Sequence, residues 1–375
     1  MLTPTPEREQ LRAVVRELLD THSTEADVRT FLDARQGFDT DTWKVMTEQV
    51  GIAALAIPEE YGGAGFGFGE LAVVMEECGR ALACVPLLST CVLAAHAILL
   101  SGDESAARTY LPGIADGSTI ATVALLDDTD RLAADDVRTL ARRSDDGWSI
   151  TGTKTFVIDG ADARLLLVPA RTEAGISLFV VESHILGAQA DGVYAEPLAA
   201  LDQTRNLATL TFDAVPATLV GTDGHGWTYI EAVLDVGAAG LAAEQVGAAA
   251  RVLETTVEYA KVREQFGRPI GSFQAIKHKL ADMLVELESA RSAAYYACGA
   301  VESGAHDLPL AASIAKAYCS DAFYHIAAES IQIHGGIGFT WEHPAHLYFK
   351  RARSSQTLLG STGHHRERVA QLAGL

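Results

Sequence analysis

The first part of the chain has the hydrophobic pattern of helices. From Glu7 to about Tyr110, apolar residues recur every three or four positions, which places them on one face of a helix. The clearest run consists of Leu11, Val14, Val15, Leu18 and Leu19. A second run extends from Phe68 to Ala83, and the glycine-rich turn IPEEYGGAGFGFGE lies between the two. The pattern predicts an N-terminal helical domain over residues 1–118.

The pattern changes twice further along the chain. Residues 119–222 contain short runs rich in β-forming residues, separated by Asp, Gly and Pro: TIATVALL, GWSITGTKTFVI, ARLLLVPA, ISLFVV and LATLTF. These runs predict a middle antiparallel β domain. Residues 223–375 return to long helical periods with alanine-rich faces, which predicts a C-terminal four-helix bundle. The expected fold class is therefore α+β, mainly α, in three domains.

Composition and charge exclude several classes of protein. The 375 residues include 29 Lys and Arg against 49 Asp and Glu, a formal net charge of −20, and 48% are hydrophobic. Such a chain can form a large core, and its acidity disfavours binding to nucleic acid or to an anionic membrane. Its most apolar run, Val85 to Leu100, is shorter than the ~18 residues that a membrane-spanning helix needs. The five cysteines show no metal-binding spacing, so we expect no metal and a reducing, cytoplasmic compartment.

Two segments carry candidate chemistry. In VREQFGRPIGSFQAIKHKLADM, Arg263 begins a cluster of basic side chains whose guanidinium groups match a phosphate, and Phe266 and Phe273 are placed to wall an aromatic ligand. In IQIHGGIGF, Gln332 precedes Gly335–Gly336, where the missing side chains let a ligand approach the backbone. A solvated surface and a simple helix C-cap explain the same two patterns, so these residues alone leave both interpretations open.

Together these segments resemble the acyl-CoA dehydrogenase family along nearly the whole chain. The resemblance rests on IPEEYGGAGFG, MEECGRAL, GWSITGTKTFVIDGADARLLLVPAR, YAKVREQFGRPIGSFQAIKHKLADM and ESIQIHGGIGFTWEHP, in this order. It implies tetramers built from dimers, with FAD at the dimer interface and an acyl-CoA thioester stacked against the flavin. In that family a glutamate removes the α proton while hydride passes from Cβ to the flavin.

The resemblance also implies which residues bind the cofactor. Those that reach across the dimer to the partner's FAD are present: Arg263 toward the pyrophosphate, then Gln265, Phe266, Ile270, Phe273 and Gln274, and toward the ADP end Gln332, Gly335 and Gly336. Those that hold a subunit's own flavin are absent. Leu126 and Ile158 stand where the family has threonines, and no Gly-Ser-Asp follows in ALLDDTDRLAADD. An aliphatic side chain cannot donate the hydrogen bond that a hydroxyl supplies.

Both usual positions of the catalytic glutamate are altered as well. Leu359 occupies one of them, in TLLGST, and Gly237 occupies the other. Glu244 lies on the helix face of Gly237 about 10 Å further along, and His364 follows Leu359 closely. Both are weak substitutes, because a paired or solvated carboxylate and a polar tail are the commoner explanations. The resemblance therefore implies a chain without the usual base.

The chain thus keeps the residues for the partner's FAD and lacks those for its own flavin and base. In this it is similar to one chain of the heteromeric acyl-CoA dehydrogenases of steroid-degrading bacteria, in which an active chain pairs with a degenerate paralogue as an α2β2 tetramer. We expect an accessory subunit that completes the partner's FAD site, with a bulky or steroid-derived acyl-CoA as substrate and an electron-transfer flavoprotein or similar acceptor. Without such a paralogue, a homo-oligomer is expected. Two alternatives stay open: an autonomous enzyme of the same fold, such as a dehydratase or a flavin monooxygenase, and a noncatalytic protein that binds acyl-CoA or a partner.

Overall fold

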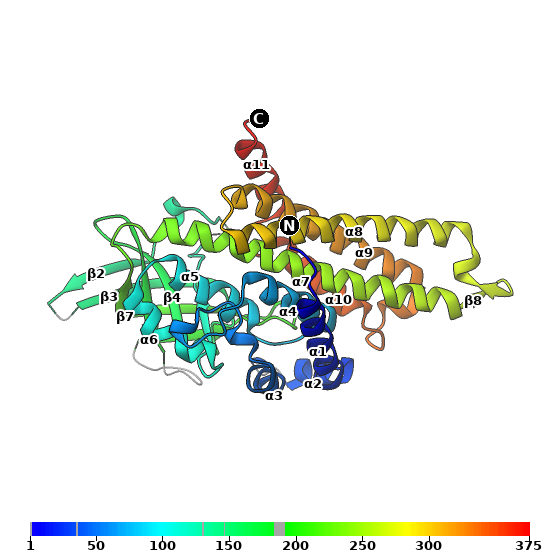
Figure 1. The fold of residues 1–375 in the computed structure, drawn as a ribbon, viewed down its shortest axis with the longest axis horizontal. Helices are drawn as coiled ribbons and strands as arrows, with labels where there is room; N and C mark the ends of the chain where they lie inside the picture. The colour runs from blue at the N-terminus through cyan, green and yellow to red at the C-terminus, as the bar shows by residue number, and fades with distance from the viewer. Residues whose placement is uncertain (1, 35–36, 130, 146, 184–191) are drawn as a thin grey trace. The chain divides into compact units, whose positions relative to one another are not determined.

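The structure is a computed structural model that describes residues 2–34, 37–129, 131–145, 147–183 and 192–375. It forms two compact units, each built from separate stretches of chain. Unit 1 comprises Met1–Thr30, Phe68–Ala83 and Ala238–Leu375, and unit 2 comprises Phe31–Gly67 and Cys84–Gly237. The order of elements, helices followed by strands and again helices, confirms the predicted fold class (Figure 1). The predicted domain boundaries after residues 118 and 222 stay a prediction.

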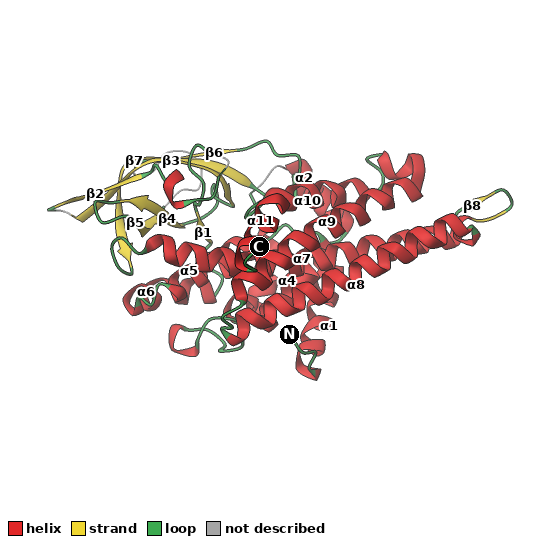
Figure 2. Ribbon diagram, turned by 90° about the horizontal axis from the view of Figure 1, so that it is seen from above, coloured by secondary structure: helices red, strands yellow, loops and turns green. Residues whose placement is uncertain are grey.

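Unit 2 is organised around a seven-stranded sheet, drawn in yellow in Figure 2. Its strands are β1 Ala121–Val123, β2 Leu140–Ser144, β3 Gly147–Ile158, β4 Leu165–Arg171, β5 Ile176–Glu182, β6 Val193–Pro197 and β7 Leu207–Val220. Six of them follow the order β1-β4-β2-β3-β7-β5, and β6 pairs with β7 beside this path. Because β4 also pairs with β5, the sheet closes on itself. The pairings are antiparallel, except that β1 and one residue pair of β2 run parallel to β4.

The burial of these strands follows their sequences. Along β7, buried and more exposed positions alternate at the start of the strand, as a sheet with one covered face requires. The paired strands β4 and β5 are instead buried over six consecutive residues each. Their sequences, LLLVPA and ISLFVV, are apolar except for Ser177, and such runs are typical of strands covered on both faces. The core of unit 2 therefore lies around these two strands.

The helices of the structure fall into three groups. Unit 2 holds the short helices α3 Thr40–Val45, α5 Ala95–Leu100 and α6 Glu104–Ala115. Unit 1 holds α1 Pro6–His22, α4 Phe68–Ala81, α8 Gln274–Ser303, α9 Leu308–His334, α10 Ala345–Thr357 and α11 Thr362–Leu372. Two helices, α2 Glu25–Ala34 and α7 Gly226–Val262, contribute to both units. Small buried residues such as Ala294, Ala297 and Ala312 let the long helices of unit 1 pack closely.

Helices α4 and α7 touch backbone to backbone. A Cβ atom on Gly247 of α7 would lie 1.7 Å from the carbonyl oxygen of Glu76, and one on Gly79 of α4 would lie 2.0 Å from that of Glu244. Neither distance is possible for a real side chain, so only glycine permits this crossing. Each helix therefore contributes one glycine to the contact, Gly79 from α4 and Gly247 from α7.

A buried network of charges surrounds that crossing. Glu77 of α4 is 1% exposed and accepts from Arg12 Nη1 at 3.0 Å and from Arg16 Nη2 at 2.7 Å, both on α1. Its neighbour Glu76 accepts from Arg12 Nη1 at 2.9 Å and from Arg291 Nη1 of α8 at 2.6 Å. A buried carboxylate is tolerated when it is paired and hydrogen-bonded in this way. The network therefore fixes α1 and α8 against α4.

We predict that Gly247→Ala lowers the free energy of unfolding by about 3 kcal/mol or more, because the new methyl group meets backbone that cannot rotate away. Denaturant unfolding followed by circular dichroism measures the change. The control is Gly363→Ala on α11, where a Cβ would meet only Ser361 Oγ at 3.8 Å, and it should be neutral or slightly stabilising. Equal stability of the two variants would contradict the crossing.

Candidate functional site

The first predicted segment forms an exposed hairpin at the end of α7. Its strands are β8 Glu264–Gln265 and β9 Arg268–Pro269. Figures 1 and 2 show the hairpin between the end of α7 and the start of α8. The two turn residues, Phe266 and Gly267, both have a positive φ, +54° and +74°. Turns of this type suit the twist of a hairpin, but phenylalanine is a strained choice there. The ring of Phe266 is nonetheless 92% exposed, which is unusual for a large apolar side chain.

Arg263 at the base of this hairpin is available to a ligand. Its backbone is held at both ends, because its amide donates to Tyr259 O at 2.9 Å and its carbonyl accepts from Ile270 N at 2.7 Å. Its guanidinium is exposed and makes no hydrogen bond or ion pair with any residue that the structure describes. Arg268 differs, since it lies over the ring of Phe273 at 4.1 Å. A fixed backbone with an unpaired guanidinium suits the binding of an anion.

The second predicted segment lies where α9 ends. Gln332 in its last turn is exposed, and Gly335 follows with a φ of +63°. A Cβ on Gly335 or Gly336 would meet nothing within 4 Å, so the backbone here faces open space. This is both a helix C-cap and a backbone that a ligand can approach, so the two interpretations of the sequence do not exclude each other.

The structure brings the two segments together. Thr256 on the last turns of α7 donates from Oγ1 to Ser330 Oγ of α9 at 2.8 Å, and Lys279 of α8 forms an ion pair with Glu329 of α9. The remaining predicted residues, Gln265, Ile270, Phe273 and Gln274, lie in the hairpin or at the start of α8. This end of unit 1 therefore presents a guanidinium, aromatic rings and open backbone on neighbouring elements.

The turn that carries Leu359 is also well defined. Leu359 has a positive φ of +56°, is 7% exposed and is followed by Gly360 at +101°. The fully buried Lys316 of α9 donates from Nζ to Gly360 O at 3.1 Å, and His365 Nε2 is 2.9 Å from Leu359 O. Burial lowers the pKa of Lys316 to about 7. The turn thus keeps a strained backbone, while leucine at its centre provides no group that can take up a proton.

The two substitute bases have other environments. Glu244 Oε1 lies 2.9 Å from Arg351 Nη1, and both side chains are buried, so this carboxylate belongs to an ion pair inside unit 1. His364 is exposed at the start of α11, and partial burial of its ring lowers its pKa. Gly237 lies buried in α7 within unit 2. None of these positions presents a free carboxylate.

In unit 2, the positions of the expected flavin contacts are aliphatic. Leu126 uses its carbonyl to accept from Thr155 N at 2.8 Å, and Ile158 uses its carbonyl to accept from Thr122 Oγ1 at 2.7 Å. The side chain of Ile158 is 5% exposed. Both residues are therefore held by their backbones and have no side-chain donor. Asp130, in the stretch that lacks Gly-Ser-Asp, lies outside the described residues.

Sequence reasoning missed a buried ion pair beside these positions. Lys154 of β3 is fully buried, and its Nζ lies 2.5 Å from Asp127 Oδ2. Burial lowers the pKa of Lys154 to about 8, an effect that Asp127 opposes. Thr139 donates to the other oxygen of Asp127 at 2.5 Å. The only hint in the sequence was a lysine within an otherwise half-buried strand.

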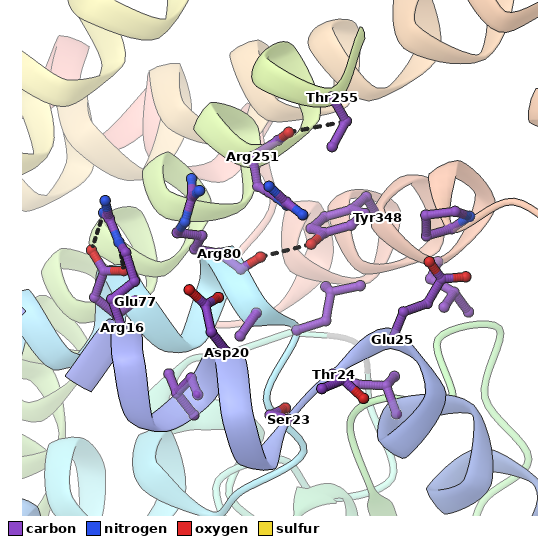
Figure 3. Close-up of a pocket in the computed structure, with 16 residues that line it drawn as sticks. Arg16, Asp20, Ser23, Thr24, Glu25, Glu77, Arg80, Arg251, Thr255 and Tyr348 are labelled. Atoms are coloured by element: carbon purple, nitrogen blue, oxygen red, sulfur yellow. Dashed lines mark hydrogen bonds and ion pairs between the residues drawn. The ribbon is translucent and has the colours of Figure 1, made fainter. Parts of the chain in front are cut away.

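A cavity of about 240 Å³ lies elsewhere in unit 1, between α1, α2, α4, α7 and α10 (Figure 3). Tyr348 in its wall donates to Arg80 O at 2.6 Å, and Arg16 pairs with Glu77. None of the residues predicted from the sequence lines it. Over the described residues, no three side chains gather as metal ligands, and no helix is long and apolar enough to cross a membrane.

Comparison with known proteins identifies the class of protein as an oxidoreductase of the acyl-CoA dehydrogenase type. Residues 5–118 match the acyl-CoA dehydrogenase N-terminal domain, and residues 224–373 match the C-terminal domain. The chain is 39% identical to the acyl-CoA dehydrogenase IpdE2 of Mycobacterium tuberculosis, over 96% of this chain and 95% of that protein. It belongs to the acyl-CoA dehydrogenase family, whose members are FAD-dependent flavoproteins.

Two solved structures are similar over the whole chain. The Tcur3481–Tcur3483 steroid ACAD matches with a TM-score of 0.87 and 34% identity, covering 98% of both chains. The ChsE4–ChsE5 complex from Mycobacterium tuberculosis matches with a TM-score of 0.88 and 29% identity, covering 100% of this chain and 99% of that one. The family and the fold implied by the sequence motifs are therefore confirmed.

We predict a pH-dependent contribution of His365 to stability. Burial lowers its pKa from 6.5 to about 4, so below about pH 6.5 the unfolded chain takes up a proton that the folded chain does not. The free energy of unfolding should therefore fall by about 3 kcal/mol as the pH decreases from 6.5 to 4. In His365→Gln this part of the decrease should be missing. The difference in the free energy of unfolding between wild type and variant should therefore become smaller at low pH.

The measurement is denaturant unfolding at a series of pH values. His306→Gln, a change at a histidine outside this turn, is the control and should follow the wild-type curve. A gap between wild type and His365→Gln that stays constant with pH would contradict the prediction.

Proposed function

We propose that this chain is the accessory subunit of a heteromeric, FAD-dependent acyl-CoA dehydrogenase: it completes the FAD site of an active paralogue in an α2β2 tetramer and supplies no catalytic base. One observation carries the proposal. The chain presents an exposed Arg263, unpaired among the described residues, at the base of a hairpin. By contrast, Leu359, Gly237, Leu126 and Ile158 leave its own site without a base or flavin-ring donors.

The exposed end of unit 1 has the composition of an interface. Its large apolar side chains include Val262, Phe266, Ile337, Phe339 and Trp341, of which Phe266 is 92% and Phe339 84% exposed. Exposed aromatic residues of this size are rarely left in water unless a partner covers them. Val262 and Phe266 lie within three residues of Arg263 in the chain, which is consistent with a cofactor bound where two chains meet.

Each residue of this end has a role that its chemistry allows. FAD, when bound, supplies the acceptor for the hydride that leaves the acyl chain. Arg263 binds the pyrophosphate, because its guanidinium fork matches two phosphate oxygens. Phe266 and Phe273 shield that contact from water, and Gln332 with Gly335–Gly336 accommodates the ADP end. Gln265, Ile270 and Gln274 complete the surface around them.

The chain's own residues do not support proton abstraction. A general base needs an accessible group whose pKa lies near the operating pH. Leucine at position 359 has no such group, and Glu244 is occupied by Arg351. His364 is exposed at the start of α11, in the polar tail of the chain. The α proton is therefore removed by the active paralogue.

The relatives support the substrate class. IpdE2 is an acyl-CoA dehydrogenase by name, and the Tcur3481–Tcur3483 structure is of a steroid ACAD. A bulky, steroid-derived acyl-CoA thioester is therefore the proposed substrate, with an electron-transfer flavoprotein or similar protein as the electron acceptor. The five cysteines are buried and form no disulfide with one another, which agrees with a reducing, cytoplasmic compartment.

We predict that the chain expressed alone retains little FAD and has no dehydrogenase activity, because its own flavin-ring contacts are aliphatic. Coexpressed with its paralogue, it should form a complex with one FAD for each pair of unlike chains. The flavin absorbance per polypeptide gives the ratio. A yellow homo-oligomer with one FAD per chain would favour an autonomous enzyme, and a complex that binds acyl-CoA without flavin would favour a binding protein.

We predict that Arg263→Ala removes FAD from the complex. A charge-assisted bond to phosphate contributes about 1.5 to 3 kcal/mol, so its loss should weaken FAD binding about ten- to a hundredfold. Arg263→Lys should recover only part of this affinity, because an ammonium cannot form two parallel bonds. FAD retained after gel filtration and activity with and without added FAD are the measurements.

The matched control for this prediction is Arg353→Ala. Arg353 is exposed on α10 and bonds to Gln356 Oε1 at 2.9 Å, so its loss changes the net charge equally at a place outside the proposed site. It should leave the FAD content unchanged. If Arg263→Ala behaves like Arg353→Ala in an assembled complex, the shared-site proposal is wrong.

A further inference from the structure

Tyr259, which lies on α7 one helical turn before Arg263, contacts both parts of the proposed cofactor surface. Its carbonyl accepts from Arg263 N at 2.9 Å, in the last turn of α7. Its hydroxyl donates to His334 O at 3.3 Å, at the end of α9. Its ring also lies against the ring of His334, with centroids 4.4 Å apart and planes tilted by 31°. One residue therefore contacts both, Arg263 through its backbone carbonyl and His334, which precedes Gly335, through its side chain.

His334 is itself fixed from several directions. It is 4% exposed, and its Nδ1 lies 2.8 Å from Ser330 O, which places the ring hydrogen on Nδ1. Its other neighbours are the ring of His343, with centroids 4.2 Å apart, and Gly338, where an added Cβ would lie 2.8 Å from His334 Cβ. Burial lowers the pKa of His334, so the ring is neutral at neutral pH. The turn after α9 is thus folded onto a rigid support.

We propose that Tyr259 is a positioning residue: through its hydroxyl bond to His334 O it sets the spacing between Arg263 and the Gly335–Gly336 turn, so that the pyrophosphate and the ADP end of the partner's FAD meet one preformed surface. The inference rests on the proposed function. A surface that is ordered before binding avoids the entropic cost of ordering it when the ligand arrives. Nothing in Tyr259 itself needs to touch the cofactor.

The hydroxyl is the part of Tyr259 that core packing alone does not explain. The ring is half-buried and would pack equally well as phenylalanine. In the part of the chain that the structure describes, the hydroxyl forms one side-chain hydrogen bond within the unit, and its acceptor is the last helical carbonyl before Gly335. A residue that only filled space would not require a donor directed at that atom.

The test is Tyr259→Phe in the assembled, FAD-containing oligomer. FAD is removed and titrated back, and the dissociation constant is followed by flavin fluorescence. Loss of one hydrogen bond should weaken FAD binding about two- to tenfold. At saturating FAD, kcat and the KM for acyl-CoA should equal those of the wild type. Hydrogen exchange of the amides of residues 335–338 should become faster in the FAD-free variant, with the rest of α9 unchanged.

Tyr296→Phe is the matched control. It removes the same group from a tyrosine of α8 whose hydroxyl donates to Asp307 Oδ2 at 2.5 Å, so any general effect of losing a tyrosine hydroxyl appears in both variants. It should leave the dissociation constant for FAD and the exchange at residues 335–338 unchanged. If Tyr259→Phe fails to assemble, hydrogen exchange in the wild-type protein tests the inference instead. A turn that is preformed must protect the amides of residues 335–338 from exchange even when FAD has been removed.

The outcomes separate this inference from the function on which it rests. If Arg263→Ala weakens FAD binding and Tyr259→Phe does not, the shared site stands and the positioning role is wrong. If neither variant affects FAD, the proposed function fails with it. Unprotected amides at residues 335–338 in the wild type would also overturn the positioning role, because the turn would then not be preformed.

Discussion

The backbone contact between α4 and α7 is the constraint on which the rest of unit 1 depends. With glycine at positions 79 and 247, the two helices approach until carbonyl oxygens take the place of side chains. This closeness brings Glu76 and Glu77 within reach of arginines on α1 and α8, where a wider crossing would leave two buried carboxylates unpaired. The direction of α7 follows from the same contact, and α7 ends at the hairpin that presents Arg263.

The two kinds of altered position have different physical consequences. At positions 126 and 158, the backbone is held by the sheet, and only the side-chain donors are lost, so the fold of unit 2 does not depend on them. On the hairpin, the chain retains a feature that costs stability in water: Phe266 has a positive φ and a ring that is 92% exposed. Such features persist where a ligand or partner compensates for them. This asymmetry, rather than any single residue, favours a subunit that serves another chain's site.

The fold was predictable from the sequence wherever local patterns decide it. The run GWSITGTKTFVI became β3 with the expected ends, because its apolar alternation and flanking turn residues act within a few positions. The short strand β6, Val193–Pro197, has a weak pattern of its own and owes its place to pairing with β7, so it was not predicted. For the site, motifs located Arg263 and Gly335, but the bond from Tyr259 to His334 joins residues 75 positions apart. No local pattern encodes such a contact.

The turn at Leu359 keeps its shape without help from the side chain at position 359. Its shape is set by groups on other helices: Lys316 binds the carbonyl of Gly360, and His365 binds that of Leu359. A Cβ on Gly360 would lie 2.9 Å from the rings of both His364 and His365, so glycine is required there whatever residue occupies position 359. On the side of the turn these contacts use only backbone atoms, so they do not depend on the side chain at position 359. A glutamate can therefore be exchanged for leucine without loss of the fold, and the consequence of the exchange falls on the chemistry.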